Sequence, residues 1–344
     1  VDFSCVLFFI YNTKFLKNVS MKKIMINFKI NFRYIYLSLA LIFSTSCNNE
    51  EASIDETENE ISNEFIGLNN ISTTFDNLGR SYQIYVPSSY SVSEPIPIVF
   101  NLHGGASTAT GYLNSIGDMR PIADTANFIV IYPQATTDSS GDPTWHLGGE
   151  NSKSTEVDDV GFISHIIDEV SSIYSIDIDR VYVTGFSNGG YLAYEIACLL
   201  SNRIAGIGVV AGHMFIDTYN YCNPSHPTPL INIHGTEDFY EGIAGYYLDQ
   251  NLSNQYWAEY NNTDPDPVIA YIENTNSQDG STVELHSWLN GDNEVSVVHY
   301  KVIGGGHSYP NLNPSSSKGY ENGDIDSNSE IWNFLSRYDI NGLR

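Results

Sequence analysis

The sequence predicts an α/β fold in which a mostly parallel sheet carries helices on both faces. Short apolar stretches rich in β-branched residues alternate along the chain with segments of helical spacing. Strands that alternate with helices pair in parallel, because each helix returns the chain across one face of the sheet. The expected strands are 95–102, 127–132, 180–184, 204–210, 228–234 and 295–303, and the expected helices are 160–174, 190–200 and 329–338.

The segment Gly185-Phe-Ser-Asn-Gly189 lies between one expected strand and the helix that follows it. A Gly-x-Ser-x-Gly sequence at a strand-to-helix turn is the nucleophile elbow of serine hydrolases. The turn is so tight that a Cβ two residues before or after the serine would clash, so glycine is required there. The N-terminus of the following helix adds a positive dipole where an oxyanion would form. Ser187 is therefore the expected nucleophile.

Two loops downstream supply partners in the order serine, acid, histidine. Asp238 follows an expected strand, and an acid at that position lies at the same sheet edge as the elbow. His307 follows three glycines after the last expected strand, in a loop that can carry an imidazole over Ser187. We expect His307 to act as the base and Asp238 to hold the ring in the right tautomer. Glu237 is a neighbouring carboxylate that the sequence does not exclude.

The strand 95–102 ends in His103-Gly-Gly105, where such hydrolases keep their second oxyanion donor. The expected oxyanion hole is the backbone N–H of Gly105 together with that of Asn188. His103 is expected to orient this loop rather than to act as a base. Asp158 and Asp159 are expected to cap the next helix. No zinc-type cluster or phosphate loop stands out in the sequence, so neither a metal nor a cofactor is expected.

These motifs resemble those of the polyhydroxybutyrate depolymerase-like and feruloyl esterase-like proteins, carbohydrate esterase family 1 in the broad sense. The resemblance runs from about Ser72 to Tyr338 and is carried by residues 80–87, 102–105, 131–134, 157–163, 185–190, 234–238 and 304–310. It implies the α/β-hydrolase fold and a secreted carboxylic-ester hydrolase. Ser187, Asp238 and His307 stand at the positions of the family's triad.

Two departures from the family pattern concern the substrate. Family members often carry Trp-Asn-Ala-Gly and paired cysteines where this chain has Trp145-His-Leu-Gly-Gly149, and that loop usually borders the acyl pocket. The final motif is His307-Ser-Tyr-Pro rather than the commoner His-Thr-Trp-Pro. Trp145 and Tyr309 are the expected substrate-binding rings, able to stack an aromatic acyl group or a sugar. The alternative is that both rings pack in the core or at its rim.

The expected reaction is ester hydrolysis through an acyl-enzyme on Ser187. Expected substrates are feruloyl or acetyl esters of plant polysaccharide fragments, or 3-hydroxybutyrate oligomers or polyester. Soluble fragments are expected ahead of solid polymer, because the only tail is a short acidic segment and no module to hold a solid surface is seen. A peptidase of the same fold and a catalytically inactive glycan-binding surface lipoprotein are the alternatives.

The charge of the chain excludes one class of partner. Lys and Arg number 15 against 41 Asp and Glu, which leaves a net charge of −26. A phosphate backbone and an anionic membrane surface would both be repelled. We therefore expect a small-molecule, oligosaccharide or oligoester substrate and no nucleic acid.

The N-terminal residues are expected to export the protein. Residues 1–20 precede Met21 and resemble sequence translated upstream of the start, and 21–46 have the basic and apolar regions of a signal peptide. Cys47 after small residues resembles a lipobox, which predicts a lipid anchor on the cell surface or outer membrane. The alternative is ordinary cleavage near Ser46. Residues 47–65 read as an acidic disordered tether and 66–344 as the catalytic domain.

Two cysteines remain once Cys5 and Cys47 are assigned to these N-terminal segments. Cys198 lies near the end of the elbow helix and Cys222 in the loop beyond it. Two leftover cysteines in an exported chain predict a disulfide. The alternative is that Cys198 is a buried free thiol.

Overall fold

The computed structural model describes residues 66–147, 157–239, 247–313 and 321–344, all of which lie in the unit Ile54–Arg344. The predictions for 1–20, for the signal peptide 21–46, for Cys47 and for the tether 47–65 fall outside the described residues. Within the described ranges, every helix is too short or too polar to cross a membrane.

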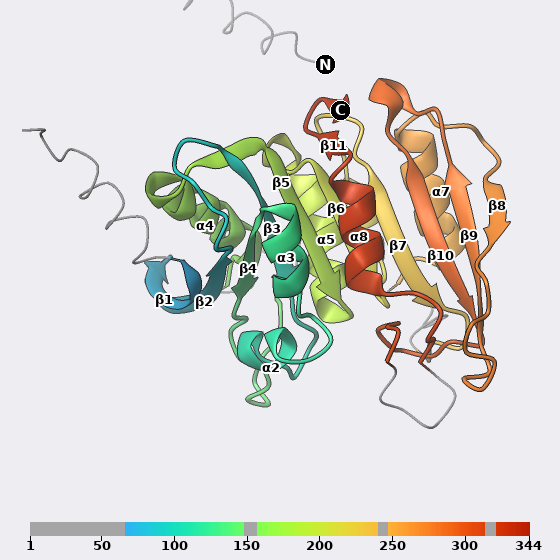
Figure 1. Cartoon of the computed structure of the whole chain (residues 1–344), viewed down its shortest axis with the longest axis horizontal. Helices are drawn as coiled ribbons and strands as arrows, with labels where there is room; N and C mark the ends of the chain where they lie inside the picture. The colour runs from blue at the N-terminus through green and yellow to red at the C-terminus, as the bar shows by residue number, and fades with distance from the viewer. Residues whose placement is uncertain (1–65, 148–156, 240–246, 314–320) are drawn as a thin grey trace, which may run out of the picture. The chain divides into compact units, whose positions relative to one another are not determined.

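A ten-stranded sheet forms the centre of the described fold (Figure 1). In chain order its strands are β1 (Gly67–Phe75), β2 (Leu78–Val86), β3 (Ile96–Leu102), β4 (Ile129–Pro133), β5 (Ile176–Phe186), β6 (Gly206–Val210), β7 (Leu230–Gly235), β8 (Val268–Tyr271), β9 (Thr282–Trp288) and β10 (Val297–Ile303). Their spatial order is β1-β2-β4-β3-β5-β6-β7-β10-β9-β8. The six central strands pair in parallel; in spatial order they are β4, β3, β5, β6, β7 and β10. The two strands at each edge, β1 and β2 on one side and β9 and β8 on the other, pair antiparallel. A short hairpin of β11 (Tyr338–Asp339) and β12 (Gly342–Leu343) lies apart from this sheet.

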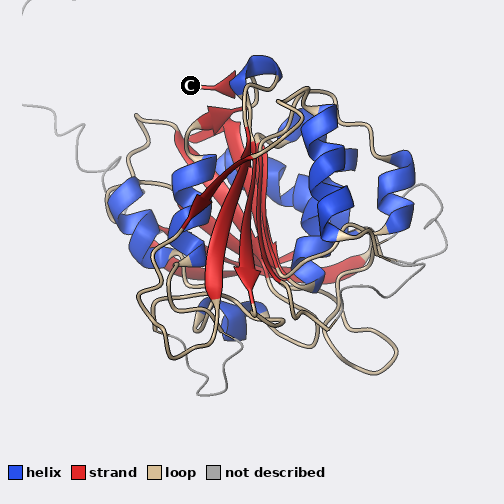
Figure 2. Cartoon of the chain, turned by 90° about the vertical axis from the view of Figure 1, so that its right-hand side faces the viewer, coloured by secondary structure: helices blue, strands red, loops and turns tan. Residues whose placement is uncertain are grey.

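Helices cover both faces of the sheet (Figure 2). The α-helices are α2 (Ala109–Leu113), α3 (Arg120–Ala126), α4 (Asp159–Ile173), α5 (Asn188–Leu199), α6 (Ile216–Tyr221), α7 (Gln250–Tyr260) and α8 (Ser327–Leu335). Apolar side chains of α4, α5 and α7 form a core with one face, and those of α2, α3 and α8 form a core with the other. Side chains alternate along a strand, so Ile98 and Phe100 enter the first core while Val99 enters the second.

The predicted mostly parallel sheet with helices on both faces is confirmed. Each of the six expected strands and three expected helices is present, with its ends shifted by a few residues. The four edge strands β1, β2, β8 and β9 were not predicted. Two of them have a weak sequence signal, because β1 alternates between half-buried and exposed residues and β8 is exposed along its whole length. By contrast, β2 alternates through the buried Tyr82, Ile84 and Val86, so its pattern was available and was missed.

A disulfide joins Cys198 near the end of α5 to Cys222 just after α6, with 4.7 Å between their Cα atoms. This pairing is the one that the sequence predicted, and it excludes the alternative of a free thiol at Cys198. The bridge closes a loop of 24 residues beside the elbow helix.

Candidate active site

Ser187 occupies a strained turn between β5 and α5. Its φ of +52° and ψ of −120° lie outside the regions that residues with a Cβ normally adopt. A Cβ on Gly185 would overlap the backbone of Gly189, and one on Gly189 would overlap the carbonyl of Leu102. The two glycines therefore let β5 turn directly into α5 and lift the Ser187 hydroxyl off the edge of the sheet.

Ser187, His307 and Asp238 form a hydrogen-bonded line. His307 Nε2 lies 2.9 Å from Ser187 Oγ, and His307 Nδ1 lies 2.8 Å from Asp238 Oδ2. A carboxylate only accepts, so Nδ1–H donates to Asp238 and Nε2 is left to accept the hydroxyl proton of Ser187. The Asp238 side chain has no exposed surface, whereas the His307 side chain is 13% exposed.

Sheet order explains why these groups meet. Asp238 follows β7 and His307 follows β10, and these two strands are parallel neighbours. Only β6 separates β7 from β5, which carries the elbow. Glu237, the alternative acid, is exposed, whereas the buried Asp238 is the carboxylate that bonds His307.

The loop after β3 passes directly against the elbow. A Cβ placed on Gly105 would lie 3.7 Å from the Cβ of Asn188, and one on Gly104 would lie 3.5 Å from the Cβ of Ser187. Among the described residues, no protein acceptor takes the backbone N–H of Gly105 or of Asn188. Both donors are thus available beside the serine hydroxyl.

His103 holds this loop in place. Its Nδ1–H donates to the carbonyl of Gly104 at 2.8 Å, and its Nε2 accepts the N–H of Ala135 at 3.1 Å. Burial lowers the pKa of the ring, which keeps it in the neutral form that both bonds require.

The expected roles of Trp145 and Tyr309 in substrate binding need correction, because both rings are buried. Trp145 is 1% exposed, and its indole N–H donates to the carbonyl of His103 at 2.8 Å. Its backbone N–H donates to the side-chain oxygen of Asn188 at 2.8 Å, so Trp145 stabilises the residue that follows Ser187 in the elbow. Tyr309 is 2% exposed and donates its hydroxyl to Asn328 at 2.7 Å. Neither ring offers a face to a bound molecule.

Phe239 is the exposed ring that the sequence reasoning missed. It is 69% exposed, and its ring centroid lies 5.3 Å from that of His307. Its position directly after Asp238 was the available signal in the sequence.

Asp158 and Asp159 were both expected to cap a helix, but only Asp158 has that role in the structure. Asp158 caps α4 by accepting the N–H of Gly161 at 2.7 Å. Asp159 is buried instead and accepts from the guanidinium of Arg80 at 2.6 Å. This ion pair ties β2 to the start of α4 beneath the loop that carries Trp145.

Two buried histidines lie behind Asp238, a contact that the sequence reasoning did not foresee. His234 Nε2 is 3.4 Å from Asp238 Oδ2, and the rings of His213 and His234 pack edge to face with centroids 4.6 Å apart. Burial lowers the pKa of both imidazoles, so both rings are neutral at pH 7. His213 in the loop after β6 and His234 in β7 are 21 residues apart and follow no zinc-binding pattern in the sequence.

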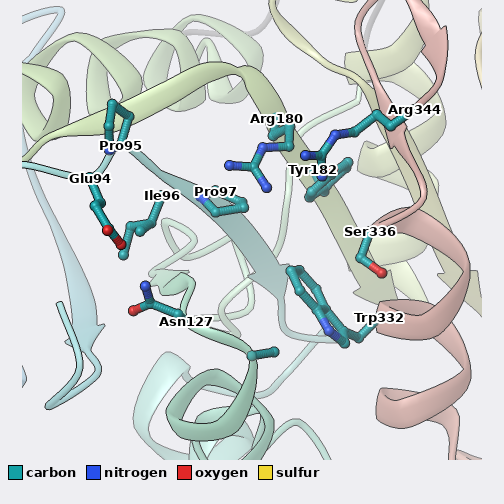
Figure 3. Close-up of a pocket in the computed structure, with 11 residues that line it drawn as sticks. Glu94, Pro95, Ile96, Pro97, Asn127, Arg180, Tyr182, Trp332, Ser336 and Arg344 are labelled. Carbon is teal, nitrogen blue, oxygen red and sulfur yellow. The ribbon is translucent and has the colours of Figure 1, made fainter. Parts of the chain in front are cut away.

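A separate hollow lies at the other end of the strands (Figure 3). It is lined by Ile96 at the start of β3, by Arg180 and Tyr182 in the middle of β5, and by Trp332 of α8. The triad groups follow the carboxyl ends of the strands, so this hollow lies away from Ser187.

Comparisons with known proteins find similarity to esterases. The chain matches the family model described as Esterase PHB depolymerase over residues 80–223. It is 29% identical over 267 residues to the bifunctional acetylxylan esterase/xylanase of Neocallimastix patriciarum, a match that covers 77% of this chain and 34% of that protein. It is 23% identical over 279 residues to feruloyl esterase D of Neurospora crassa, a match that covers 78% of this chain and 85% of that protein. The chain therefore spans about a third of the first relative and most of the second.

The fold also has counterparts among solved structures. The acetyl xylan esterase from Aspergillus awamori superposes with a TM-score of 0.57 at 15% identity, over 78% of this chain and 99% of that one. This likeness shows a shared α/β-hydrolase fold. The resemblance to polyhydroxybutyrate depolymerase-like and feruloyl esterase-like proteins is confirmed, since the matching family model and both relatives are named for esterases.

Proposed function

We propose that the chain hydrolyses carboxylic esters through an acyl-enzyme on Ser187. The observation that carries the proposal is the line from Ser187 Oγ through His307 to the buried Asp238, with both bonds at hydrogen-bonding distance. Groups in this arrangement act as nucleophile, general base and orienting acid.

In the first half of the reaction, His307 Nε2 removes the hydroxyl proton as Ser187 Oγ attacks the ester carbonyl. The carbonyl oxygen becomes negative, and the N–H groups of Gly105 and Asn188 donate to it. His307 then gives its proton to the leaving alcohol, and the acyl group stays on Ser187. Asp238 stabilises the imidazolium that forms between these steps.

In the second half, water takes the place of the alcohol. His307 removes a proton from water, the hydroxide attacks the acyl carbon, and the same two N–H groups hold the oxyanion. Ser187 leaves with the proton returned by His307, and the carboxylic acid is released. Neither half of this reaction uses a redox group.

For the substrate, we propose feruloyl or acetyl esters on soluble oligosaccharides, with hydroxybutyrate oligomers as the second class. The relatives named above support both acyl groups, because one is called a feruloyl esterase and the other an acetylxylan esterase. Phe239 adds local support, since an exposed ring beside His307 can stack on an aromatic acyl group or a sugar. The net charge of −26 favours neutral substrates over polyanionic ones.

A panel of substrates tests this proposal. The purified chain is assayed on methyl ferulate, acetylated xylo-oligosaccharides, hydroxybutyrate oligomers, solid polyhydroxybutyrate and a peptide amide, with the Ser187→Ala variant as the control. We expect turnover of the first two substrates, weaker turnover of the oligomers, and complete loss after treatment with a serine-directed phosphonate. Faster clearance of the solid polymer, or cleavage of the peptide alone, would contradict the substrate class.

We also propose that the protein is exported and that a lipid is attached at Cys47. The signal-like 21–46 and the small residues before Cys47 support this location. Mass spectrometry of the N-terminal peptide from the membrane fraction tests it. A lipid-free N-terminus at a residue other than Cys47 would contradict the anchor.

A further inference from the structure

Three metal-ligating groups converge behind the candidate triad. One ring nitrogen from each of His213 and His234 and one carboxylate oxygen of Asp238 all lie within 4.8 Å of one another. Within the described ranges, this is the one group of three or more such side chains at these separations. The close approach therefore needs a physical account.

The two imidazoles also leave buried nitrogens unsatisfied. His234 is 3% exposed, and neither of its ring nitrogens has a hydrogen-bond partner among the described residues. His213 is 1% exposed and lacks a described partner at Nε2, while its Nδ1 lies 3.1 Å from Gln250 Nε2. Buried polar groups without partners destabilise the fold, so a group that binds them would recover that free energy.

We propose that His213, His234 and Asp238 bind a transition-metal ion of the zinc class, and that the bound ion inhibits the esterase. Two imidazole nitrogens and one carboxylate oxygen form a donor set that suits Zn²⁺ or Co²⁺ and does not suit Mg²⁺ or Ca²⁺. Ligand atoms on tetrahedral zinc are separated by about 3.3 Å, which the 3.4 Å between His234 Nε2 and Asp238 Oδ2 already meets. Binding requires side-chain rotations that shorten the remaining separations, which are at most 4.8 Å.

The protons of the cluster permit this binding. A neutral imidazole has a lone pair on one of its two ring nitrogens and can bind a metal ion through it. At His234 neither nitrogen has a described partner, so its proton can lie on Nδ1 while Nε2 binds the ion. At His213 the proton moves from Nε2 to Nδ1, which breaks the bond from Gln250 and leaves Nε2 to bind the ion. No proton leaves the protein in this exchange.

Inhibition follows from the oxygen that the ion would take. Asp238 Oδ2, the oxygen nearest His234, is also the acceptor for His307 Nδ1 at 2.8 Å. An ion on that oxygen withdraws its negative charge from His307 and adds a positive charge beside the imidazolium that catalysis must form. This second part rests on the proposed function, whereas metal binding does not.

The experiment separates the two parts. The full chain and its Ser187→Ala variant are titrated with Co²⁺, and the visible ligand-field absorption is followed. Initial ester-hydrolysis rates are measured for the wild type with Zn²⁺, with Mg²⁺ and after a chelator. We expect one equivalent of Co²⁺ to bind both proteins, Zn²⁺ to slow hydrolysis at least tenfold, the chelator to restore the rate and Mg²⁺ to have no effect.

Variants assign the ligands. His213→Gln and His234→Gln should each lose the Co²⁺ absorption, and each should lose the response to Zn²⁺ relative to its own metal-free rate. The matched control is His286→Gln, which removes another imidazole that lies 2.9 Å from a carboxylate oxygen, Glu284 Oε2. This control should retain both signals.

Three results would overturn the proposal or one of its parts. Absence of Co²⁺ absorption in the wild type, or its retention in both glutamine variants, would exclude the site. Binding without inhibition by Zn²⁺ would exclude the inhibitory role. A wild type that cleaves no ester would count against the proposed function, while the Co²⁺ titration would still decide the metal site. Should the variants fail to fold, X-ray absorption at the zinc edge of the wild type decides whether two imidazoles ligate.

Discussion

The guanidinium of Arg80 donates a hydrogen bond to Asp159 across 2.6 Å, and both side chains are buried. The second carboxylate oxygen of Asp159 accepts the backbone N–H of His146 at 2.8 Å. The preceding residue, Trp145, bonds both Asn188 and the loop of His103. A single buried ion pair thus connects β2 and α4 to the turn that carries the candidate nucleophile.

Removal of one partner of this pair should destabilise the fold strongly. Arg80→Met leaves the Asp159 carboxylate buried without its cation, and Asp159→Leu leaves the guanidinium buried without its anion. Each should lower the free energy of unfolding by about 3–5 kcal/mol, measured by urea denaturation. The double variant should lose less than the sum of the singles, because no unpaired charge remains. Single variants within about 1 kcal/mol of the wild type would contradict this reading of the pair.

The candidate triad should behave as a unit. Ser187→Ala and His307→Ala should each reduce kcat by about four orders of magnitude or more, and Asp238→Asn should leave a small residual activity. Steady-state kinetics on a chromogenic acetate measure these losses. Glu237→Gln is the control, because that side chain is exposed and should keep nearly full activity. More than about a tenth of the activity in Ser187→Ala would exclude the acyl-enzyme mechanism.

Phe239 should select aromatic acyl groups. An aromatic pair contributes about 0.5–1.5 kcal/mol, so Phe239→Ala should lower kcat/KM for methyl ferulate by about 2- to 10-fold and leave methyl acetate unchanged. Tyr271→Ala removes an equally exposed ring on the edge strand β8 and is the matched control. Equal losses on both esters would show that Phe239 supports the loop rather than the substrate.

The disulfide between Cys198 and Cys222 should stabilise the domain without affecting the chemistry. Closing a loop of 24 residues restricts the unfolded chain, and such bridges contribute about 2–4 kcal/mol. The double variant Cys198→Ala/Cys222→Ala should therefore lose that amount of unfolding free energy in urea, with kcat unchanged at 25 °C. An unchanged urea midpoint would contradict a stabilising bridge.

Acid should destabilise the fold through its buried neutral histidines. Burial lowers the pKa of His103 and places that of His299 well below its usual range. Below about pH 6.5 the unfolded chain gains protons that the folded chain does not. The free energy of unfolding then falls by up to about 1.4 kcal/mol per pH unit for each such histidine, until the folded ring itself titrates.

Urea denaturation at pH 7 and pH 5.5 measures this effect. His299→Leu should lose about 1 kcal/mol less than the wild type between the two pH values, because one proton-binding group is absent from the unfolded chain. Equal losses in both proteins would place the acid sensitivity elsewhere.

Much of the fold was predictable because its local signals agree with its topology. The parallel strands β3, β5, β6, β7 and β10 are rich in buried apolar and β-branched residues, and parallel pairing brings their carboxyl ends to one edge of the sheet. The elbow at Ser187 and the loops of Asp238 and His307 each follow such a strand, so their proximity could be expected from chain order. The outermost strands β1 and β8 could not, because β1 is half exposed and β8 fully exposed, which removes the apolar pattern.

The sequence by itself determined the α/β-hydrolase fold, the resemblance to esterases and the residues that meet at Ser187. Those features depend on short segments and on the order in which they occur. Only the tertiary structure decided that Trp145 and Tyr309 are buried, that Asp238 rather than Glu237 bonds His307, and that His213 lies behind that acid. Burial and contact of this kind arise where segments far apart in the chain pack together, and no local pattern records which side chain the packing will cover.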